Sequence, residues 1–495
     1  MDTDGNRWLK FRSGSEIRGP QEALTDDFAQ RLGYVFSLWL AENLGKDPKA
    51  LVLAVGRDER PSGKRLLAAL SKGMLAAGCD VQDCGQCAAP ALFMAAQGDA
   101  DGAVMVTATP ANAALNGFKL MTGKGGPDSA DVKDMLRRAQ DAEVPERLAV
   151  GPDAASRRYY EHLRRVAAKY LEDDALKPLL GLRVIVDARG AVGAEYARFL
   201  EALGVETEGS LTAPSPAVAD PESPETLAAL ADAVAEKRAD LGVAFTADGT
   251  RAFFVDRDGR PIAQNRLIAL VAAILLDTAP GLTFITDSVT SSALSAFIAE
   301  WGGIHYRFKR GYRSVIEEAV RLNAEGIDCP IAMETSGHAA FRENGFMDDG
   351  LYLATRLICE ALNRKREGHD LSELIDGLQE PVESAELRLP VLPYEDWDPE
   401  EEVQAIVEGI LSHTLTHPEW QMAPDNREGV RITFNLDGGI NNAWFQLRMS
   451  VHDPVMVLHA ESDIPGGVKR VLSPLYDLIR DTELLDVEPL REAIG

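Results

Sequence analysis

The stretch ALVLAVGRDERPSGKRLLAALSKGMLAAGCDV (residues 50–81) combines an apolar strand pattern, a turn of small residues, an amphipathic helix pattern that ends near glycine, and a second strand pattern. The same order returns in GLRVIVDARGAVGAEYARFLEALGVETEG (residues 181–209) and in GLTFITDSVTSSALSAFIAEWGGIHYRF (residues 281–308). Each stretch predicts a strand, a helix and a second strand. Because such units build parallel or mixed sheets with helices on both faces, we predict an α/β chain with three similar α/β/α domains and mixed sheets.

Residues from about Ala385 onward follow a different pattern. Short strand patterns occur at VRITFNL, AWFQLRMSV and VMVLHAES, and helices are expected between them. They predict a smaller C-terminal α+β domain. Shifts in composition and turn signals place the four domains at residues 1–150, 151–258, 259–380 and 381–495.

The composition limits the partners of the chain. Its 495 residues carry 51 Lys and Arg against 78 Asp and Glu, a formal net charge of −27, which disfavours nucleic acid and anionic membranes. The apolar runs are too short to span a bilayer, and the first residues lack the apolar core of a signal peptide. Five sparse cysteines give no disulfide framework, and the C-x-x-C pair of Cys84 and Cys87 is a weak metal signal for which core packing is the alternative. We expect a cytoplasmic protein that needs a local basic pocket for any phosphorylated ligand.

Polar residues gather in turns that follow strand patterns, which is where α/β folds place their ligands. These turns are KFRSGSEIRG with Arg18, VGRDERPSG, TADGTR with Asp248 and Arg251, and METSGH with Glu334, Ser336 and His338. Solvated charges at a strand end would explain any one of these turns. Four such turns in one chain favour a ligand site.

Read together, these turns resemble the motifs of the α-D-phosphohexomutase family, the phosphoglucomutases and phosphomannomutases. The most specific match is METSGH (residues 333–338), followed by DDGLYLATRLICEAL (residues 348–362), where the family has a G-E-x-S-G-H turn and a D-G-x-x-x-A-L helix. The resemblance covers essentially the whole chain. It implies four domains around a central cleft, with a phosphoserine on the first, a metal on the second, sugar contacts on the third and a phosphate clamp on the fourth.

The family's serine loop, T-A-S-H-N-P-x-x-x-N-G-x-K, reads TATPANAALNGFK in this chain. The alignment places Thr109 where the phosphorylated serine belongs, with Pro110 replacing histidine and Ala111 replacing asparagine. The resemblance also implies catalytic roles for Lys119 and Arg18. A threonine hydroxyl can carry a phosphoryl group, but its extra methyl group restricts χ1 and crowds an in-line approach.

The family's metal loop, D-G-D-x-D-R, reads TADGTR and leaves Asp248 as its one carboxylate, with Thr246 and Thr250 at the other two positions. Mg²⁺ is usually held by carboxylates together with phosphate oxygens. The loop therefore predicts weak or no Mg²⁺ binding. Without the ion, phosphoryl transfer loses charge stabilisation on the order of several kcal/mol.

The remaining motifs are altered unevenly. Arg313 stands at the lysine position of the family's T-x-V-G-x-K turn, and the R-P-S-G-T-E-P clamp reads RMSVHDP, which keeps Arg448 and Ser450 and places His452 at the threonine. Loss of the clamp glycine hinders close backbone approach to a phosphate. The resemblance thus implies substrate contacts for Glu334, Ser336, His338, Arg251, Arg313, Arg448, Ser450 and His452.

Two functions are compatible with these observations. In the first, the chain is a non-catalytic family member that binds a hexose phosphate or bisphosphate, or a protein partner. In the second, it is an atypical mutase that moves phosphate between C6 and C1 of a hexose on Thr109, with Lys119, Arg251 and an ion at Asp248. The combined changes in the nucleophile and metal loops favour the first. A third alternative is that the turn residues persist for structural reasons alone.

Overall fold

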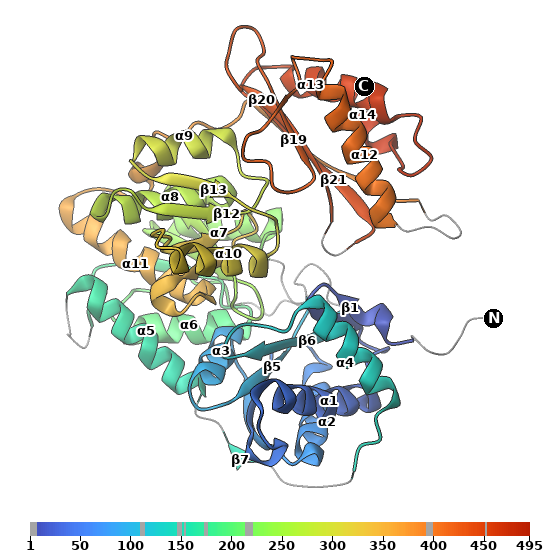
Figure 1. Cartoon of the computed structure of the whole chain (residues 1–495). Coiled ribbons are helices and arrows are strands. Elements are labelled where there is room, and N and C mark those ends of the chain that lie inside the picture. Colours follow the sequence, from blue (N-terminus) through green and yellow to red (C-terminus); the bar gives the residue numbers. More distant parts are fainter. Residues whose placement is uncertain are drawn as a thin grey trace. The chain divides into compact units, whose positions relative to one another are not determined.

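The computed structural model describes residues 7–108, 114–145, 151–152, 155–172, 177–212, 221–392, 399–450 and 453–495. The chain forms two units: the first unit contains Met1–Ala263 and Gly337–Glu373, and the second contains Gln264–Ser336 and Leu374–Gly495 (Figure 1). The predicted nucleophile Thr109 and the predicted clamp residue His452 lie outside the described residues.

Residues 50–81 form the predicted βαβ unit. Strands β3 (Val52–Arg57) and β4 (Asp80–Gln86) pair in parallel, and α2 (Gly63–Ala77) connects them. They belong to a sheet of order β1-β2-β6-β5-β3-β4-β7, in which β6 is antiparallel to its neighbours β2 and β5. The other elements are β1 (Arg12–Ser13), β2 (Glu16–Pro20), α1 (Asp26–Leu44), α3 (Ala89–Gln97), β5 (Gly102–Val106), β6 (Leu115–Thr122), α4 (Ser129–Asp141) and β7 (Gly151–Pro152).

The second βαβ prediction is partly wrong. Strand β8 (Val184–Val186) and α6 (Ala191–Ala202) form as predicted, but the expected second strand is reduced to isolated bridges of Glu206 and Leu211. Glycines on both sides, Gly204 and Gly209, have positive φ and limit the extended segment to a few residues. The sheet order is β11-β10-β9-β8. The remaining elements of the first unit are α5 (Ala155–Leu171), α7 (Pro224–Lys237), β9 (Leu241–Phe245), β10 (Ala252–Asp256), β11 (Pro261–Ile262), β15 (Ala339–Phe341), β16 (Met347–Asp348) and α11 (Gly350–Glu367).

The third βαβ prediction is confirmed in the second unit. Strands β12 (Thr283–Thr286) and β13 (Ile304–Arg307) pair in parallel on either side of α9 (Ser292–Glu300) in the chain. Strand β14 (Ile331–Met333) is also parallel to β12. Helices α8 (Gln264–Thr278) and α10 (Tyr312–Ala324) complete this part of the second unit.

The C-terminal residues form the predicted further sheet domain, with antiparallel order β17-β21-β20-β19-β18. Its elements are β17 (Glu383–Pro390), α12 (Pro399–Thr414), β18 (Gln421–Met422), β19 (Val430–Phe434), β20 (Ala443–Met449), β21 (Val455–Ser462), α13 (Gly467–Ile479) and α14 (Glu488–Ile494). The expectation of helices between the last three strands is wrong, since the described residues between them form turns and not helices.

Residues alternate strictly across this antiparallel sheet. Phe445, Leu447 and Leu458 belong to the apolar core, whereas Gln446, Arg448 and His459 lie on the opposite face because side chains alternate along a strand. One face of the sheet is therefore apolar and the other carries charge. The charged face supplies the candidate clamp residues.

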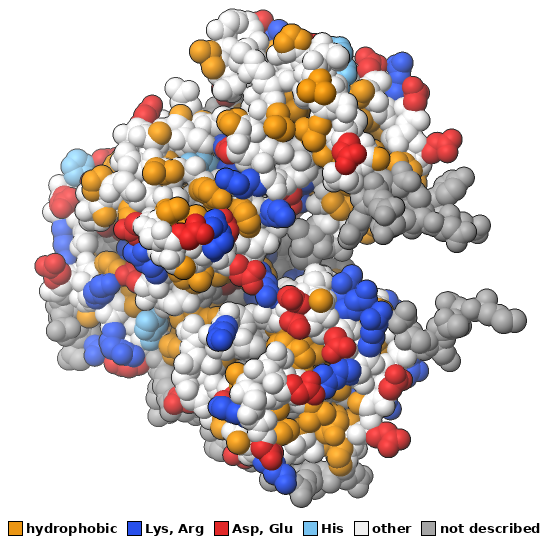
Figure 2. All heavy atoms as spheres, viewed as in Figure 1, with side chains coloured by type: hydrophobic (Ala, Val, Ile, Leu, Met, Phe, Trp, Pro, Cys, Tyr) orange, Lys and Arg blue, Asp and Glu red, His pale blue; other side chains and the backbone are white. Residues whose placement is uncertain are grey.

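All five cysteines, including Cys84 and Cys87, are buried, as the packing alternative for the C-x-x-C pair requires. Acidic and basic side chains are interspersed on the face of the molecule shown in Figure 2. Among the described residues, no helix is at once long enough and apolar enough to cross a bilayer.

The close approach of α1 to α2 generates a stability prediction. A Cβ atom on Gly73 would lie 1.8 Å from the carbonyl oxygen of Gln30, so the two backbones must separate to admit it. We expect Gly73→Ala to destabilise the first unit by at least about 1–3 kcal/mol, the usual cost of overpacking. Calorimetric melting of the full chain should show a lower transition temperature.

Gly409→Ala is the matched control, because Gly409 lies within α12 and its added Cβ would meet nothing within 4 Å. That substitution should stabilise its helix by up to about 1 kcal/mol. Equal transition temperatures for the Gly73→Ala variant and the parent chain would contradict the proposed close packing.

Candidate functional site

The loop between β9 and β10 holds Asp248 through internal donors. The hydroxyl groups of Thr246 and Thr250 donate to the same carboxylate oxygen, Oδ1, at 2.7 and 2.9 Å, and the amide of Thr250 donates to it at 3.2 Å. The Thr246 hydroxyl also accepts a hydrogen bond from the amide of Arg251. Both threonine hydroxyl groups therefore donate to Asp248.

The carboxylate of Asp248 is ionised. Burial opposes its ionisation, but the charge of Lys119 and the hydrogen bonds from the two threonines lower its pKa to about 2. Mg²⁺ is usually held by several carboxylate oxygens, and this loop offers one carboxylate, whose Oδ1 already accepts three hydrogen bonds. Among the described residues, no group of three His, Cys, Asp or Glu side chains is arranged to hold a metal ion. The side chains present do not fit Mg²⁺.

Lys119 and Arg18 are held by carboxylates of the first unit. Arg18 forms an ion pair with Glu16, and the Nζ atom of Lys119 lies 3.9 Å from Glu16 Oε1 and 3.8 Å from Asp348 Oδ2. The same Asp348 oxygen lies 2.7 Å from Nδ1 of His338. Burial raises the pKa of Glu16, but Arg18 and Lys119 more than offset it and lower the pKa overall. The structure thus brings the predicted residues Arg18, Lys119 and His338 into one charged cluster.

Arg251 lies beside this cluster along the backbone. It forms an isolated β-bridge with His338, and its guanidinium lies 5.6 Å from the ring centre of Phe253. Its Nη1 atom forms an ion pair with Glu222 Oε1 at 2.7 Å. Glu222 was not identified from the sequence, because 29 residues separate the two partners.

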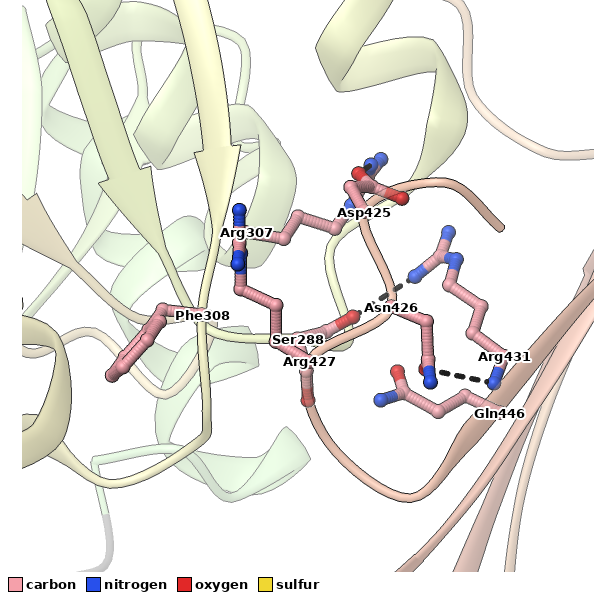
Figure 3. A pocket seen from close by; sticks show the side chains of 8 residues that line it. All are labelled: Ser288, Arg307, Phe308, Asp425, Asn426, Arg427, Arg431 and Gln446. Carbon is pink, nitrogen blue, oxygen red and sulfur yellow. Dashed lines mark hydrogen bonds and ion pairs between the residues drawn. The ribbon is translucent and has the colours of Figure 1, made fainter. Parts of the chain in front are cut away.

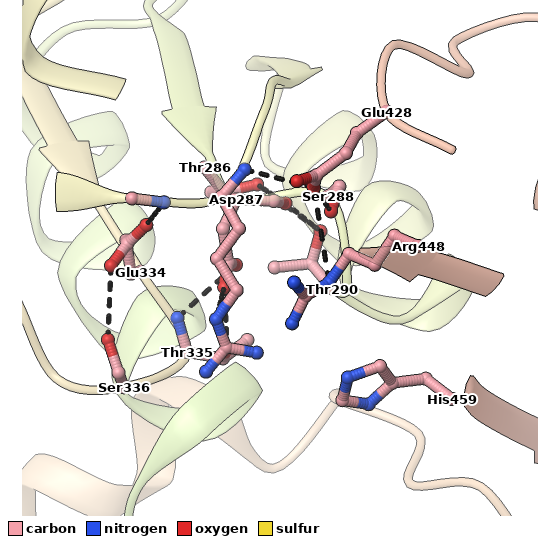
Figure 4. Close-up of polar contacts among 12 residues, drawn as sticks. Thr286, Asp287, Ser288, Thr290, Glu334, Thr335, Ser336, Glu428, Arg448 and His459 are labelled. Atoms are coloured by element: carbon pink, nitrogen blue, oxygen red, sulfur yellow. Dashed lines mark hydrogen bonds and ion pairs between the residues drawn. The ribbon is translucent and has the colours of Figure 1, made fainter. Parts of the chain in front are cut away.

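The sugar turn in the second unit is organised around two buried carboxylates (Figure 4). Glu334 accepts from the amide of Gly311 at 2.5 Å and from the hydroxyl of Ser336 at 3.2 Å. Asp287 accepts from the hydroxyl of Thr335 at 2.7 Å. Gly311 has a φ of 121°, which residues other than glycine rarely adopt. A glycine is therefore needed at this position to direct its amide at Glu334. The predicted residues Glu334 and Ser336 are adjacent.

Arg310 occupies a more central place in this cluster than the predicted Arg313. Arg313 lies on α10 and donates to Glu317 on the same helix at 2.7 Å. Arg310 instead lies with its Nε atom 3.9 Å from Asp287 Oδ2. Burial opposes ionisation of Arg310, but the charges of Asp287 and Glu334 raise its pKa overall.

Arg448 and Ser450 lie at the end of β20. Arg448 is 4% exposed, with Nε 4.0 Å from Glu428 Oε2, and this oxygen accepts from the hydroxyl of Ser288 at 2.5 Å. His459, on the neighbouring strand, lies on the same polar face (Figure 4). Burial and the charges of nearby arginines, Arg448 first among them, lower the pKa of His459 to about 3, so it is neutral. The alternation of polar and apolar residues in β20 and β21 is the sequence signal that would have identified it.

A small pocket lies in the second unit where the turn before β19 meets the ends of β12 and β13 (Figure 3). Arg307 forms an ion pair with Asp425 and donates to Ser291 O and Ser295 Oγ, while Nη1 of Arg431 donates to Ser288 O at 2.9 Å. These contacts fix the turn that carries Glu428. The lining residues are Ser288, Arg307, Phe308, Asp425, Asn426, Arg427, Arg431 and Gln446.

The predicted residues therefore fall into two groups. Arg18, Lys119, Asp248, Arg251 and His338 lie in the first unit, and Glu334, Ser336, Arg313, Arg448 and Ser450 lie in the second. Their common placement around one cleft stays a prediction.

Comparisons with known proteins bear on the family and the fold of the chain. Residues 10–145, 157–259 and 263–382 match the models for alpha/beta/alpha domains I, II and III of Phosphoglucomutase/phosphomannomutase. A Phosphomannomutase/phosphoglucomutase of Pseudomonas putida is 29% identical over 475 residues, which cover 91% of this chain and 92% of the relative.

Two solved structures share the fold. The Phosphoglucomutase/phosphomannomutase family protein of Burkholderia thailandensis has a TM-score of 0.77 at 24% identity, covering 96% of this chain and 99% of that one. The Aspergillus fumigatus N-acetylphosphoglucosamine mutase in complex with GlcNAc-6P and magnesium has a TM-score of 0.56 at 13% identity, covering 95% of this chain and 96% of that one. With three domain models matched in order over most of its length, the chain belongs to the α-D-phosphohexomutase family.

Proposed function

We propose that this phosphohexomutase-family protein binds hexose phosphates and has little or no mutase activity. The observation that carries the proposal is the loop of Asp248, where two threonine hydroxyls donate to the carboxylate at 2.7 and 2.9 Å. A loop satisfied in this way keeps its shape without a metal ion. A phosphoryl-transfer transition state would lack the charge stabilisation that the ion supplies in metal-assisted enzymes.

The retained polar turns support the binding half of the proposal. Glu334 is buried and offers acceptor oxygens to vicinal sugar hydroxyls, with Ser336 as its hydrogen-bonded neighbour. Arg251 and Arg448 offer guanidinium groups suited to phosphate. The Aspergillus fumigatus relative, which was solved with GlcNAc-6P, supports a phosphorylated hexose as the ligand class.

Binding of a hexose phosphate is the direct test. Glucose 6-phosphate or mannose 6-phosphate should raise the melting temperature of the protein, because a ligand that binds only the folded state stabilises it by mass action. Glu334→Ala should abolish the shift, and Thr109→Ala should preserve it. Glu300→Ala, which removes an exposed glutamate at the end of α9, is the control and should leave the shift unchanged. A protein that shows no shift with any hexose phosphate would refute the binding role.

Mg²⁺ affinity tests the metal loop. Calorimetric titration of the unliganded protein should show no saturable Mg²⁺ binding, because the Thr246 and Thr250 hydroxyls donate to Asp248. The double variant Thr246→Asp, Thr250→Asp should bind the ion. Micromolar affinity in the unmodified protein that disappears in Asp248→Ala would contradict this prediction.

Mutase turnover tests the catalytic half. The unmodified protein should isomerise hexose phosphates at the background rate, and no single replacement should raise it, since nucleophile and metal act as a unit. The combined variant Thr109→Ser, Pro110→His, Ala111→Asn, Thr246→Asp, Thr250→Asp should gain measurable turnover in a coupled assay with Mg²⁺. Robust turnover by the unmodified protein that is lost in Thr109→Ala would establish the atypical mutase instead.

A further inference from the structure

Each predicted phosphate-binding cation that the structure describes has a carboxylate partner. Arg18 and Lys119 approach Glu16, Arg313 pairs with Glu317, and Arg448 approaches Glu428. Arg251 pairs with Glu222 at 2.7 Å. A phosphate that enters must therefore compete with a carboxylate at every one of these positions.

These carboxylate partners differ in how easily they can separate from their cations. The side chains of Glu16 and Glu428 are 12% and 17% exposed, so separating them from their cations would leave a poorly hydrated charge. Glu317 lies one helical turn from Arg313 on the same helix. Glu222 is 42% exposed and belongs to a different segment from Arg251, so its carboxylate can return to water at small cost.

The backbone of Arg251 is fixed while Glu222 lies at the start of another element. The amide of Arg251 donates to the Thr246 hydroxyl at 3.2 Å, and its carbonyl accepts from the Thr246 amide at 3.1 Å. Glu222 immediately precedes Ser223, the N-cap of α7. Displacement would thus move the glutamate side chain and leave the arginine in place.

We propose that the Glu222 carboxylate pairs with the Arg251 guanidinium in the unliganded protein, and that the phosphate group of the ligand displaces this carboxylate. Glu222 thereby affects the affinity for phosphorylated hexoses and leaves the affinity for unphosphorylated hexoses unchanged. This inference rests on the proposed binding function and deepens it.

The experiment measures dissociation constants by calorimetry for glucose 6-phosphate and mannose 6-phosphate, with free glucose and mannose as phosphate-free probes. Glu222→Gln should tighten sugar-phosphate binding roughly two- to fivefold, the factor that an ion pair of this exposure is worth. The binding of the free sugars should not change. Glu225→Gln removes the same charge from an exposed position three residues away, in the first turn of α7, and should match the parent protein.

A double-variant comparison locates the effect. In an Arg251→Gln background, Glu222→Gln should no longer tighten binding, since its partner is absent. Equal affinities for Glu222→Gln and Glu225→Gln, or weaker binding by Glu222→Gln, would overturn the inference while leaving the proposed function intact. If folded parent protein and Glu222→Gln both fail to bind any hexose phosphate, the proposed function itself fails and the inference with it.

Discussion

Ion pairs between cations and carboxylates determine how the turns of each unit are held in this acidic protein. Lys119 lies between Glu16 and Asp348, and Asp348 also contacts His338, so one carboxylate contacts a residue within β6 and a residue just before β15. In the second unit, Glu428 receives the Ser288 hydroxyl and the Arg310 amide and stands next to Arg448. These carboxylates accept hydrogen bonds from neutral groups and also neutralise nearby cations. These contacts connect the turns to the strands of their unit.

The loop of Asp248 is also held by contacts to a carboxylate, but hydroxyl groups take the place of cations as its partners. An isolated carboxylate away from bulk water is costly unless donors surround it. Three donors converge on one oxygen of Asp248, and Lys119 adds a favourable charge. The Thr246 and Thr250 hydroxyls therefore satisfy the carboxylate of a loop that contains no second acidic residue.

The sequence predicted the repeated βαβ pattern because strand, turn and helix periodicities are local properties. It failed at residues 205–211, where two glycines shorten the segment, since the pattern does not say how many residues a strand retains. Motifs placed Glu334 and Asp248 in turns that follow strands, and their roles stay predictions. Glu222 and Arg310 were missed because their contacts join separate segments of the chain, and the alternation in β20 and β21 that points to His459 was not used. In a chain with many charged residues, residue types alone do not predict which acid pairs with which base.

The proposed function separates binding from catalysis, and the two depend on different interactions in the transition state. Hydrogen bonds to sugar hydroxyls and to a phosphate group act equally in the ground state and the transition state, so they lower the free energy of the complex without accelerating the reaction. The nucleophile and the metal ion act mainly on the transition state, where charge develops on the transferred group. Under the proposed function, the changes in those two loops remove transition-state stabilisation, whereas Glu334 and Ser336 keep the hydrogen bond that prepares them for a sugar. The proposal therefore needs only local substitutions for a mutase fold to keep its class of ligand and lose the reaction.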